Sequence, residues 1–111
     1  SGMELSNVGL WRAVERCIEL APAAVVLGGG GYNPWTVARC WTGLWGRLNS
    51  WPTGARLPPA AQELLRGLDS DLVEEEDRLE RWTTHLADAP NPGAVREAVR
   101  SVLDRALHDL A

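Results

Sequence analysis

The 111-residue sequence contains no lysine and no phenylalanine, and it has one tyrosine, one methionine and two cysteines. Its 11 basic residues are therefore all arginines, and 15 acidic residues outnumber them to give a net charge of −4. No basic stripe is visible, which argues against a nucleic-acid partner. No run of 18 apolar residues occurs either, so the sequence predicts no membrane-spanning helix.

The two cysteines and the short length limit the class of protein further. Cys17 and Cys40 lie 23 positions apart, outside any C-x-x-C arrangement. We therefore expect two free thiols in a reducing, cytoplasmic compartment. A chain of this length forms one domain at most. Residues 1–3, Ser-Gly-Met, are interpreted as an expression scar that precedes the native sequence.

Helical periodicity accounts for most of the chain. Apolar residues at helical spacing predict helices over residues 7–20 and 34–48, the second with Asn33 as N-cap and Pro34 in the first turn. Further helices are expected over residues 60–68, over the acidic segment 71–86, and from Asn91-Pro92 to about residue 110. The remaining apolar run, residues 23–27, has the length and the adjacent valines of a strand buried on both faces of a parallel sheet. The expected chain is thus mostly α-helical with one short strand.

A single buried strand cannot satisfy its own hydrogen-bonding groups. Parallel neighbours require crossover connections, and this sequence contains none. We therefore interpret the chain as the end of a longer protein, with residues 4–50 closing its main domain and residues 51–111 forming a helical extension.

Four consecutive glycines, Gly28 to Gly31, follow the predicted strand and precede Tyr32, the only tyrosine. Glycine is costly to order, so four in a row indicate that a ligand or another backbone lies close to the chain there. The order of strand, glycine-rich turn and helix is also that of dinucleotide-binding proteins, but the G-x-G-x-x-G spacing fails because its third glycine position is Asn33 or Pro34. A P-loop is excluded because no Gly-Lys-Ser/Thr is present.

The stretch "LGGGGYNPWTVARCWTGLW", residues 27–45, resembles the C-terminal signature of the zinc-dependent histone deacetylase family. It is most similar to the bacterial acetoin-utilisation-type members, which carry a glycine run, a tyrosine and then Ala-Arg-Cys-Trp, here residues 38–41. The resemblance implies an arginase-like α/β domain, a parallel sheet flanked by helices, in which residues 23–27 are the last strand. It also implies a deacetylase whose zinc ligands, two aspartates and a histidine, lie before the present chain.

By the same resemblance, Tyr32 is the catalytic residue of this segment. In the family, zinc polarises an amide carbonyl and activates water, and the tyrosine stabilises the charge that develops on the oxygen. A phenol keeps its proton at neutral pH and can donate without carrying charge. Gly29, Gly30 and Gly31 then form the wall of the acyl pocket, against an acetylated substrate such as acetyl-lysine or another small amide.

Several expectations follow for the chain by itself. It holds no metal ligand set, because His85 and His108 stand alone on separate helices. It should be inactive without the N-terminal part of the deacetylase domain, its expected partner. The unpaired strand predicts a homo-oligomer, and so does the apolar patch that Trp35, Trp41 and Trp45 would expose in a monomer. The alternative is a stand-alone helical interaction or oligomerisation module.

Overall fold

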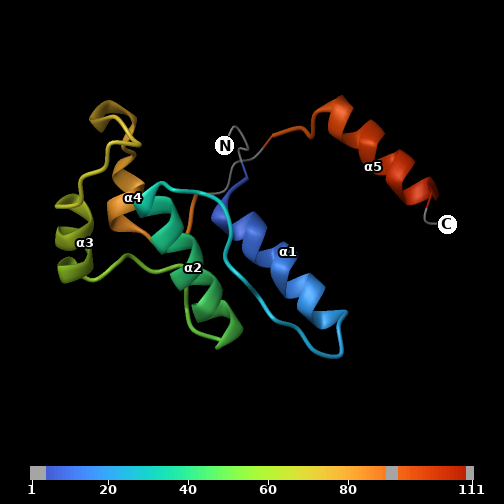
Figure 1. Ribbon diagram of the computed structural model, residues 1–111, viewed down its shortest axis with the longest axis horizontal. Helices are drawn as coiled ribbons and strands as arrows, with labels where there is room; N and C mark the ends of the chain where they lie inside the picture. The colour runs from blue at the N-terminus through green and yellow to red at the C-terminus, as the bar shows by residue number, and fades with distance from the viewer. Residues whose placement is uncertain (1–4, 90–92, 110–111) are drawn as a thin grey trace.

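The computed structural model of the chain describes residues 5–89 and 93–109. The interpreted scar at residues 1–3 and the helix start expected at Asn91-Pro92 lie outside these residues. The elements are five α-helices and one short 3₁₀ helix among the described residues: α1 (Asn7–Glu19), α2 (Pro34–Leu48), α3 (Pro59–Arg66), η1 (Glu75–Asp77), α4 (Glu80–Thr84) and α5 (Glu97–Asp109). Figure 1 shows α1 beside α2, α3 and α4 grouped around the other side of α2, and α5 standing apart.

The first two helices begin where local sequence signals predict. Ser6 caps α1 by accepting a hydrogen bond from the Gly9 amide at 3.1 Å. Asn33 caps α2 in the same way through Thr36, at 3.1 Å, and Pro34 occupies the first turn. Side-chain oxygens at these positions satisfy amides that a helix leaves unpaired at its start.

A small apolar core joins α1, α2 and α3. Trp11, Trp35, Leu44 and Leu65 are its buried hydrophobic members among the described residues. Trp11 of α1 is fully buried, and its indole Nε1 donates to the Cys40 carbonyl of α2 at 2.8 Å. Buried indoles need a partner for this donor, so the bond fixes the height of α1 along α2.

Trp35 attaches the first turn of α2 to α3. Its Nε1 donates to the Leu65 carbonyl at 2.7 Å, and the Arg78 guanidinium lies 4.6 Å from its ring centroid. Only 1% of Trp35 is exposed. The expectation that Trp35 joins Trp41 and Trp45 in an exposed patch is therefore wrong for Trp35, because α3 and Arg78 cover it.

Two predicted elements differ from the structure. Residues 24–29 have no regular secondary structure, and no strand occurs in the described parts of the chain, where the one isolated bridge joins Arg56 and His85. Residues 23–27 do not form the predicted strand, because no other described segment lies where it could pair with them. The expected acidic helix over 71–86 is also wrong. Its helical parts are η1 and α4 alone. Residues 71–74, 78, 79, 85 and 86 are non-helical, and Arg78 contacts Asp69 and Trp35.

The last helix is shorter than expected at its start. α5 begins at Glu97 rather than near residue 91, and the predicted apolar position Leu110 lies outside the described residues. The proposed division of the chain at residue 50 stays a prediction.

Candidate functional site

The glycine loop leads directly into the N-terminus of α2. Gly30 and Gly31 have φ angles of 69° and 71°. This left-handed region strains any residue that carries a Cβ atom, and two consecutive positions there explain why the loop requires glycine. Asn33 then returns to extended backbone and caps α2. The chain thus bends at Gly30 and Gly31 and places Tyr32 directly before the N-cap of α2.

One face of α2 supports this loop from below. A Cβ added to Gly28 would lie 3.0 Å from Cζ2 of Trp41, and one added to Gly31 would lie 3.6 Å from a methyl group of Val37. Val37 and Trp41 are four residues apart and so share a face of the helix. The first and last glycines therefore rest on α2, and Gly28 leaves just enough room for the Trp41 indole.

Gly29 and Gly30 face open space, since a Cβ at either would meet nothing within 4 Å among the described residues. Tyr32 is 80% exposed. The structure therefore brings the four predicted site residues together in one loop, Gly29 to Tyr32, and it points the phenol away from the core. The close approach of a substrate to Gly29, Gly30 and Gly31 stays a prediction.

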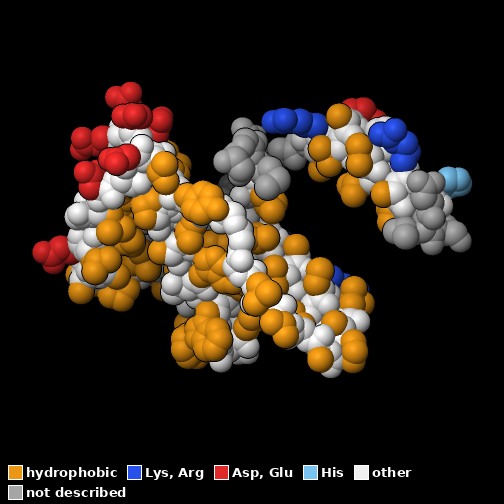
Figure 2. Space-filling model, in the orientation of Figure 1, with side chains coloured by type: hydrophobic (Ala, Val, Ile, Leu, Met, Phe, Trp, Pro, Cys, Tyr) orange, Lys and Arg blue, Asp and Glu red, His pale blue; other side chains and the backbone are white. Residues whose placement is uncertain are grey.

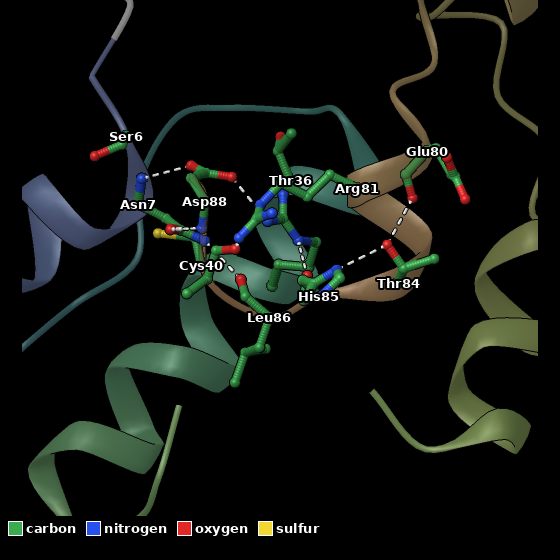
Figure 3. Close-up of polar contacts among 12 residues, drawn as sticks. Ser6, Asn7, Thr36, Cys40, Glu80, Arg81, Thr84, His85, Leu86 and Asp88 are labelled. Atoms are coloured by element: carbon green, nitrogen blue, oxygen red, sulfur yellow. Dashed lines mark hydrogen bonds and ion pairs between the residues drawn. The ribbon is translucent and has the colours of Figure 1, made fainter. Parts of the chain in front are cut away.

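A buried polar network lies behind this loop (Figure 3). Arg39 of α2 is 2% exposed. Its Nε donates to the His85 carbonyl at 2.7 Å, and its Nη2 contacts Asp88 Oδ1 at 2.7 Å. Buried arginines are stable only when paired in this manner. Arg39 thus has a structural role, because it ties α2 to residues 85–88.

Asp88 connects the same network to α1. Its second carboxylate oxygen accepts from the Asn7 backbone amide at 2.8 Å, at the first turn of the helix. The Asn7 side chain completes the junction by donating to the Leu86 carbonyl at 2.8 Å and accepting from the Asp88 amide at 2.9 Å. A carboxylate is favoured at a helix N-terminus, which stabilises the contact of Asp88 with α1. Since Asp88 also pairs with Arg39, it connects α1 to α2.

The sequence did not reveal this junction as a unit. Asn7 and Asp88 are separated by 81 positions, and neither belongs to a recognisable short motif. Arg39 was the one available signal, because an arginine on a predominantly apolar helix requires a partner. Next to it, burial raises the pKa of the Cys40 thiol. Both cysteines are free, Cys17 at the surface and Cys40 half-buried.

Metal-binding groups are not assembled in the described part of the chain. Across residues 5–89 and 93–109, no three His, Cys, Asp or Glu side chains lie where they could hold a metal ion together. The His85 ring contacts the Thr84 hydroxyl at 2.9 Å, and its carbonyl serves Arg39. In the same residues no helix is long and apolar enough to span a bilayer.

An apolar groove opens on the other side of the loop, between α1 and residues 24–27. It encloses about 450 Å³, and every lining residue is apolar or a cysteine. The lining comprises Ala13, Val14, Cys17, Ile18 and Ala21 on one side and Ala24, Val25, Val26 and Leu27 on the other. Its lining side chains are thus apolar or thiol, and it contains no charged side chain.

Two solved structures match this chain over nearly its whole length. The crystal structure of an HDAC homolog from Aquifex aeolicus is 34% identical, with a TM-score of 0.82 over 96% of this chain. The crystal structure of an HDAC homolog complexed with SAHA is also 34% identical, with a TM-score of 0.80 over 96%. The chain spans 28% of the length of each. No family model and no curated protein matches. The chain is thus a mostly helical piece with the arginase-like fold of HDAC homologs, as its sequence predicts.

Proposed function

We propose that this chain is the C-terminal part of a zinc-dependent deacetylase of the acetoin-utilisation type, and that Tyr32 stabilises the oxyanion formed during amide hydrolysis. The observation that carries the proposal is the Gly29–Tyr32 loop. It has two left-handed glycines and an exposed phenol, within a chain 34% identical to HDAC homologs over 96% of its length. Loops at the ends of strands in open α/β sheets commonly form active sites.

The chemistry assigned to Tyr32 is hydrogen-bond donation. When water adds to an amide carbonyl, negative charge develops on the oxygen, and a donor already aimed at that position stabilises the transition state more than the substrate. The phenol is at the end of a loop whose first and last glycines rest on α2. The loop therefore lies on a helix that Trp35 and Arg39 hold against the rest of the chain, and this support favours a donor role for Tyr32.

The open space beside Gly29 and Gly30 suits a small acyl group that packs against bare backbone. An acetyl group of acetyl-lysine or of a similar amide is the substrate class we infer. Zinc does not fit the described residues as a ligand set. We assign the metal and its ligands to the remaining part of the protein, and we expect this chain to be inactive without it.

The test is the Tyr32→Phe variant in the complete protein that contains this chain. The change keeps the ring and removes the donor, so kcat for an acetyl-lysine peptide should fall roughly 100-fold, with KM nearly unchanged. A matched control is Trp51→Phe, which alters another exposed aromatic residue away from the loop and should retain activity. A Tyr32→Phe enzyme with more than a third of the original kcat would reduce Tyr32 to a wall residue.

A second measurement addresses the chain itself. Purified and dialysed, it should hold less than stoichiometric zinc and show no turnover of the same peptide. One tightly bound zinc ion per chain, or turnover above background, would contradict the assignment of the metal and its ligands to the remaining part of the protein.

A further inference from the structure

Four consecutive carbonyl groups, those of residues 84–87 at and just beyond the end of α4, each accept a hydrogen bond from a different residue. In the order of the carbonyls, the donors are the Leu57 amide at 2.8 Å, Arg39 Nε at 2.7 Å, Asn7 Nδ2 at 2.8 Å and Arg81 Nε at 3.1 Å. Three of these donors are side chains of α2, α1 and α4, so the segment lies where the three helices meet (Figure 3). An irregular segment whose carbonyl groups are all bound is held in one conformation by tertiary contacts.

Asp88 follows this segment and binds both α2 and α1 through its carboxylate. Oδ1 pairs with Arg39 Nη2 at 2.7 Å, and Oδ2 accepts from the Asn7 backbone amide at 2.8 Å. The Arg39 side chain is 2% exposed. A buried guanidinium is strongly destabilised without its carboxylate. Asp88, together with the His85 carbonyl, therefore determines where the Arg39 side chain lies.

Arg39 lies on the side of α2 opposite the glycine loop. The loop rests on Val37 and Trp41, which lie within 4 Å of the Cβ positions of its last and first glycines. Arg39 is two positions from each of them, or about 200° around the helix. The helix α2 thus carries the loop on one side and is bound through Arg39 on the other. A rotation of α2 about its axis would break the Arg39 contacts and would move the loop with its phenol.

We propose that Asp88 is a positioning residue for Tyr32, which acts through Arg39 by fixing the rotation of α2. The inference rests on the proposed function and adds the group that holds the oxyanion donor in place. Asp88 contacts Arg39 and α1 rather than the loop, so it affects where the phenol lies and not the phenol itself. A displacement of about 1 Å can lower a rate about 100-fold even when its origin is far from the reacting atoms.

The test is Asp88→Asn in the complete protein that contains this chain. The new amide has one oxygen and can accept from Arg39 or from Asn7, but not from both. We expect kcat for an acetyl-lysine peptide to fall roughly tenfold, with KM nearly unchanged. The matched control is Glu15→Gln, which also removes a carboxylate from an arginine of α2, but at Arg47 in the last turn of the helix. Its kcat should equal that of the parent.

A double-mutant cycle separates positioning from a general loss of folded protein. If Asp88 acts through the Tyr32 hydroxyl, Asp88→Asn should change kcat by no more than about twofold once Tyr32→Phe has removed that hydroxyl. A merely structural role would lower the folded fraction and would therefore lower kcat by the same factor in both backgrounds.

A second variant, Asn7→Ala, disturbs the same junction more mildly and decides the question if Asp88→Asn does not fold. It leaves the Asp88 carboxylate both of its partners and removes the side-chain bonds to the Leu86 carbonyl and the Asp88 amide. Its loss of kcat should be smaller than that of Asp88→Asn and should again be absent in the Tyr32→Phe background.

Hydrogen exchange follows α2 without the need for turnover. The Thr36 and Val37 amides bond to Asn33 at 3.1 and 3.0 Å and so report on the first turn of the helix. Deuterium uptake by the peptide that covers residues 33–38, measured by mass spectrometry, should be faster in Asp88→Asn than in the parent. It should be unchanged in Glu15→Gln.

The outcomes distinguish this inference from the function on which it rests. An equal loss of kcat in both backgrounds would overturn the positioning role and leave the proposed function intact. Unchanged kcat or unchanged deuterium uptake in Asp88→Asn would do the same. A complete protein that does not hydrolyse the peptide, or a Tyr32→Phe enzyme that keeps its kcat, would refute the proposed function and the positioning role together.

Discussion

The contact between α1 and α2 depends on a single missing methyl group, at Gly43. Trp11 is fully buried and lies flat against this glycine, in the middle of α2. A Cβ added there would lie 2.7 Å from Cε2 of the indole and would overlap Cζ2 and Cη2. The contact is with the body of the ring rather than with the end of a flexible chain, so either the helix or the indole must move.

The expected effect of Gly43→Ala is a balance of opposing contributions. Alanine is favoured over glycine within a helix by about 1 kcal/mol. Overpacking a core costs about 1–3 kcal/mol, and displacing Trp11 also breaks its hydrogen bond to the Cys40 carbonyl, a further ~1 kcal/mol. With overpacking near the middle of its range, the net loss is about 2 kcal/mol. Expulsion of the whole indole would raise it, since about 150–250 Å² of aromatic surface would become exposed.

The free energy of unfolding is measured by urea denaturation followed by far-UV circular dichroism. Gly46→Ala is the matched control, because Gly46 is also a buried glycine of α2, but its added Cβ would lie 3.1 Å from Thr53 Cγ2 and 3.8 Å from Trp51 Cβ, and it would overlap no ring. The control should stay within about 1 kcal/mol of the parent, because the helix preference offsets a small shift of that methyl group. A Gly43→Ala chain as stable as the parent, or more stable, would refute the packing described here.

Two further predictions concern the glycine loop and a surface ion pair. Gly30→Ala should lower the free energy of unfolding by about 1–2 kcal/mol. The loss comes from backbone strain alone, because Gly30 has a φ of 69° and no neighbour that a Cβ would meet. Gly29 has no positive φ, so Gly29→Ala is the control and should be neutral in the same urea titration. Equal effects at both positions would contradict the strain argument. Glu15 binds Arg47 through two hydrogen bonds of 2.6 Å, and that contact lowers the pKa of Glu15 below its ordinary value of 4.5. The pair therefore stabilises the fold above pH 4.5 and loses its effect as the pH falls through the lowered folded-state pKa. Glu15→Gln should cost up to about 1 kcal/mol at pH 7, and the difference from the parent should vanish near pH 3; a difference that persists there would exclude the ion pair as its cause.

The sequence predicts α1 and α2 to within a residue or two because their signals are local. The Asn33-Pro34 pair and the apolar spacing act within one or two turns of the chain, and the structure begins α2 at Pro34 as expected. The need for glycine in the loop is equally local, since it comes from two consecutive φ angles. Features of this kind are set before any tertiary contact forms, so a sequence displays them directly.

The acidic segment shows where such reasoning stops. Apolar residues at helical spacing predicted one helix over 71–86, yet Leu72 and Leu79 are mostly exposed in the structure. The helix is broken at Arg78, which bonds Asp69 at 2.8 Å and lies over the Trp35 ring. Periodicity describes which face a helix would bury, but only a tertiary partner decides whether that face is used. Residues 71–74 and 85–86 are non-helical as well, so the local pattern fails along most of the segment.

The same distinction between local and distant contacts explains why the candidate site is recognisable yet incomplete. Tyr32 and its glycines form one uninterrupted stretch, so the loop is visible in the sequence even though the phenol is 80% exposed. The groups that orient α2 beneath it, Arg39 and Asp88, lie 49 positions apart and are seen only in the folded chain. The local sequence therefore identifies the loop, whereas the contacts that orient its helix require the folded chain.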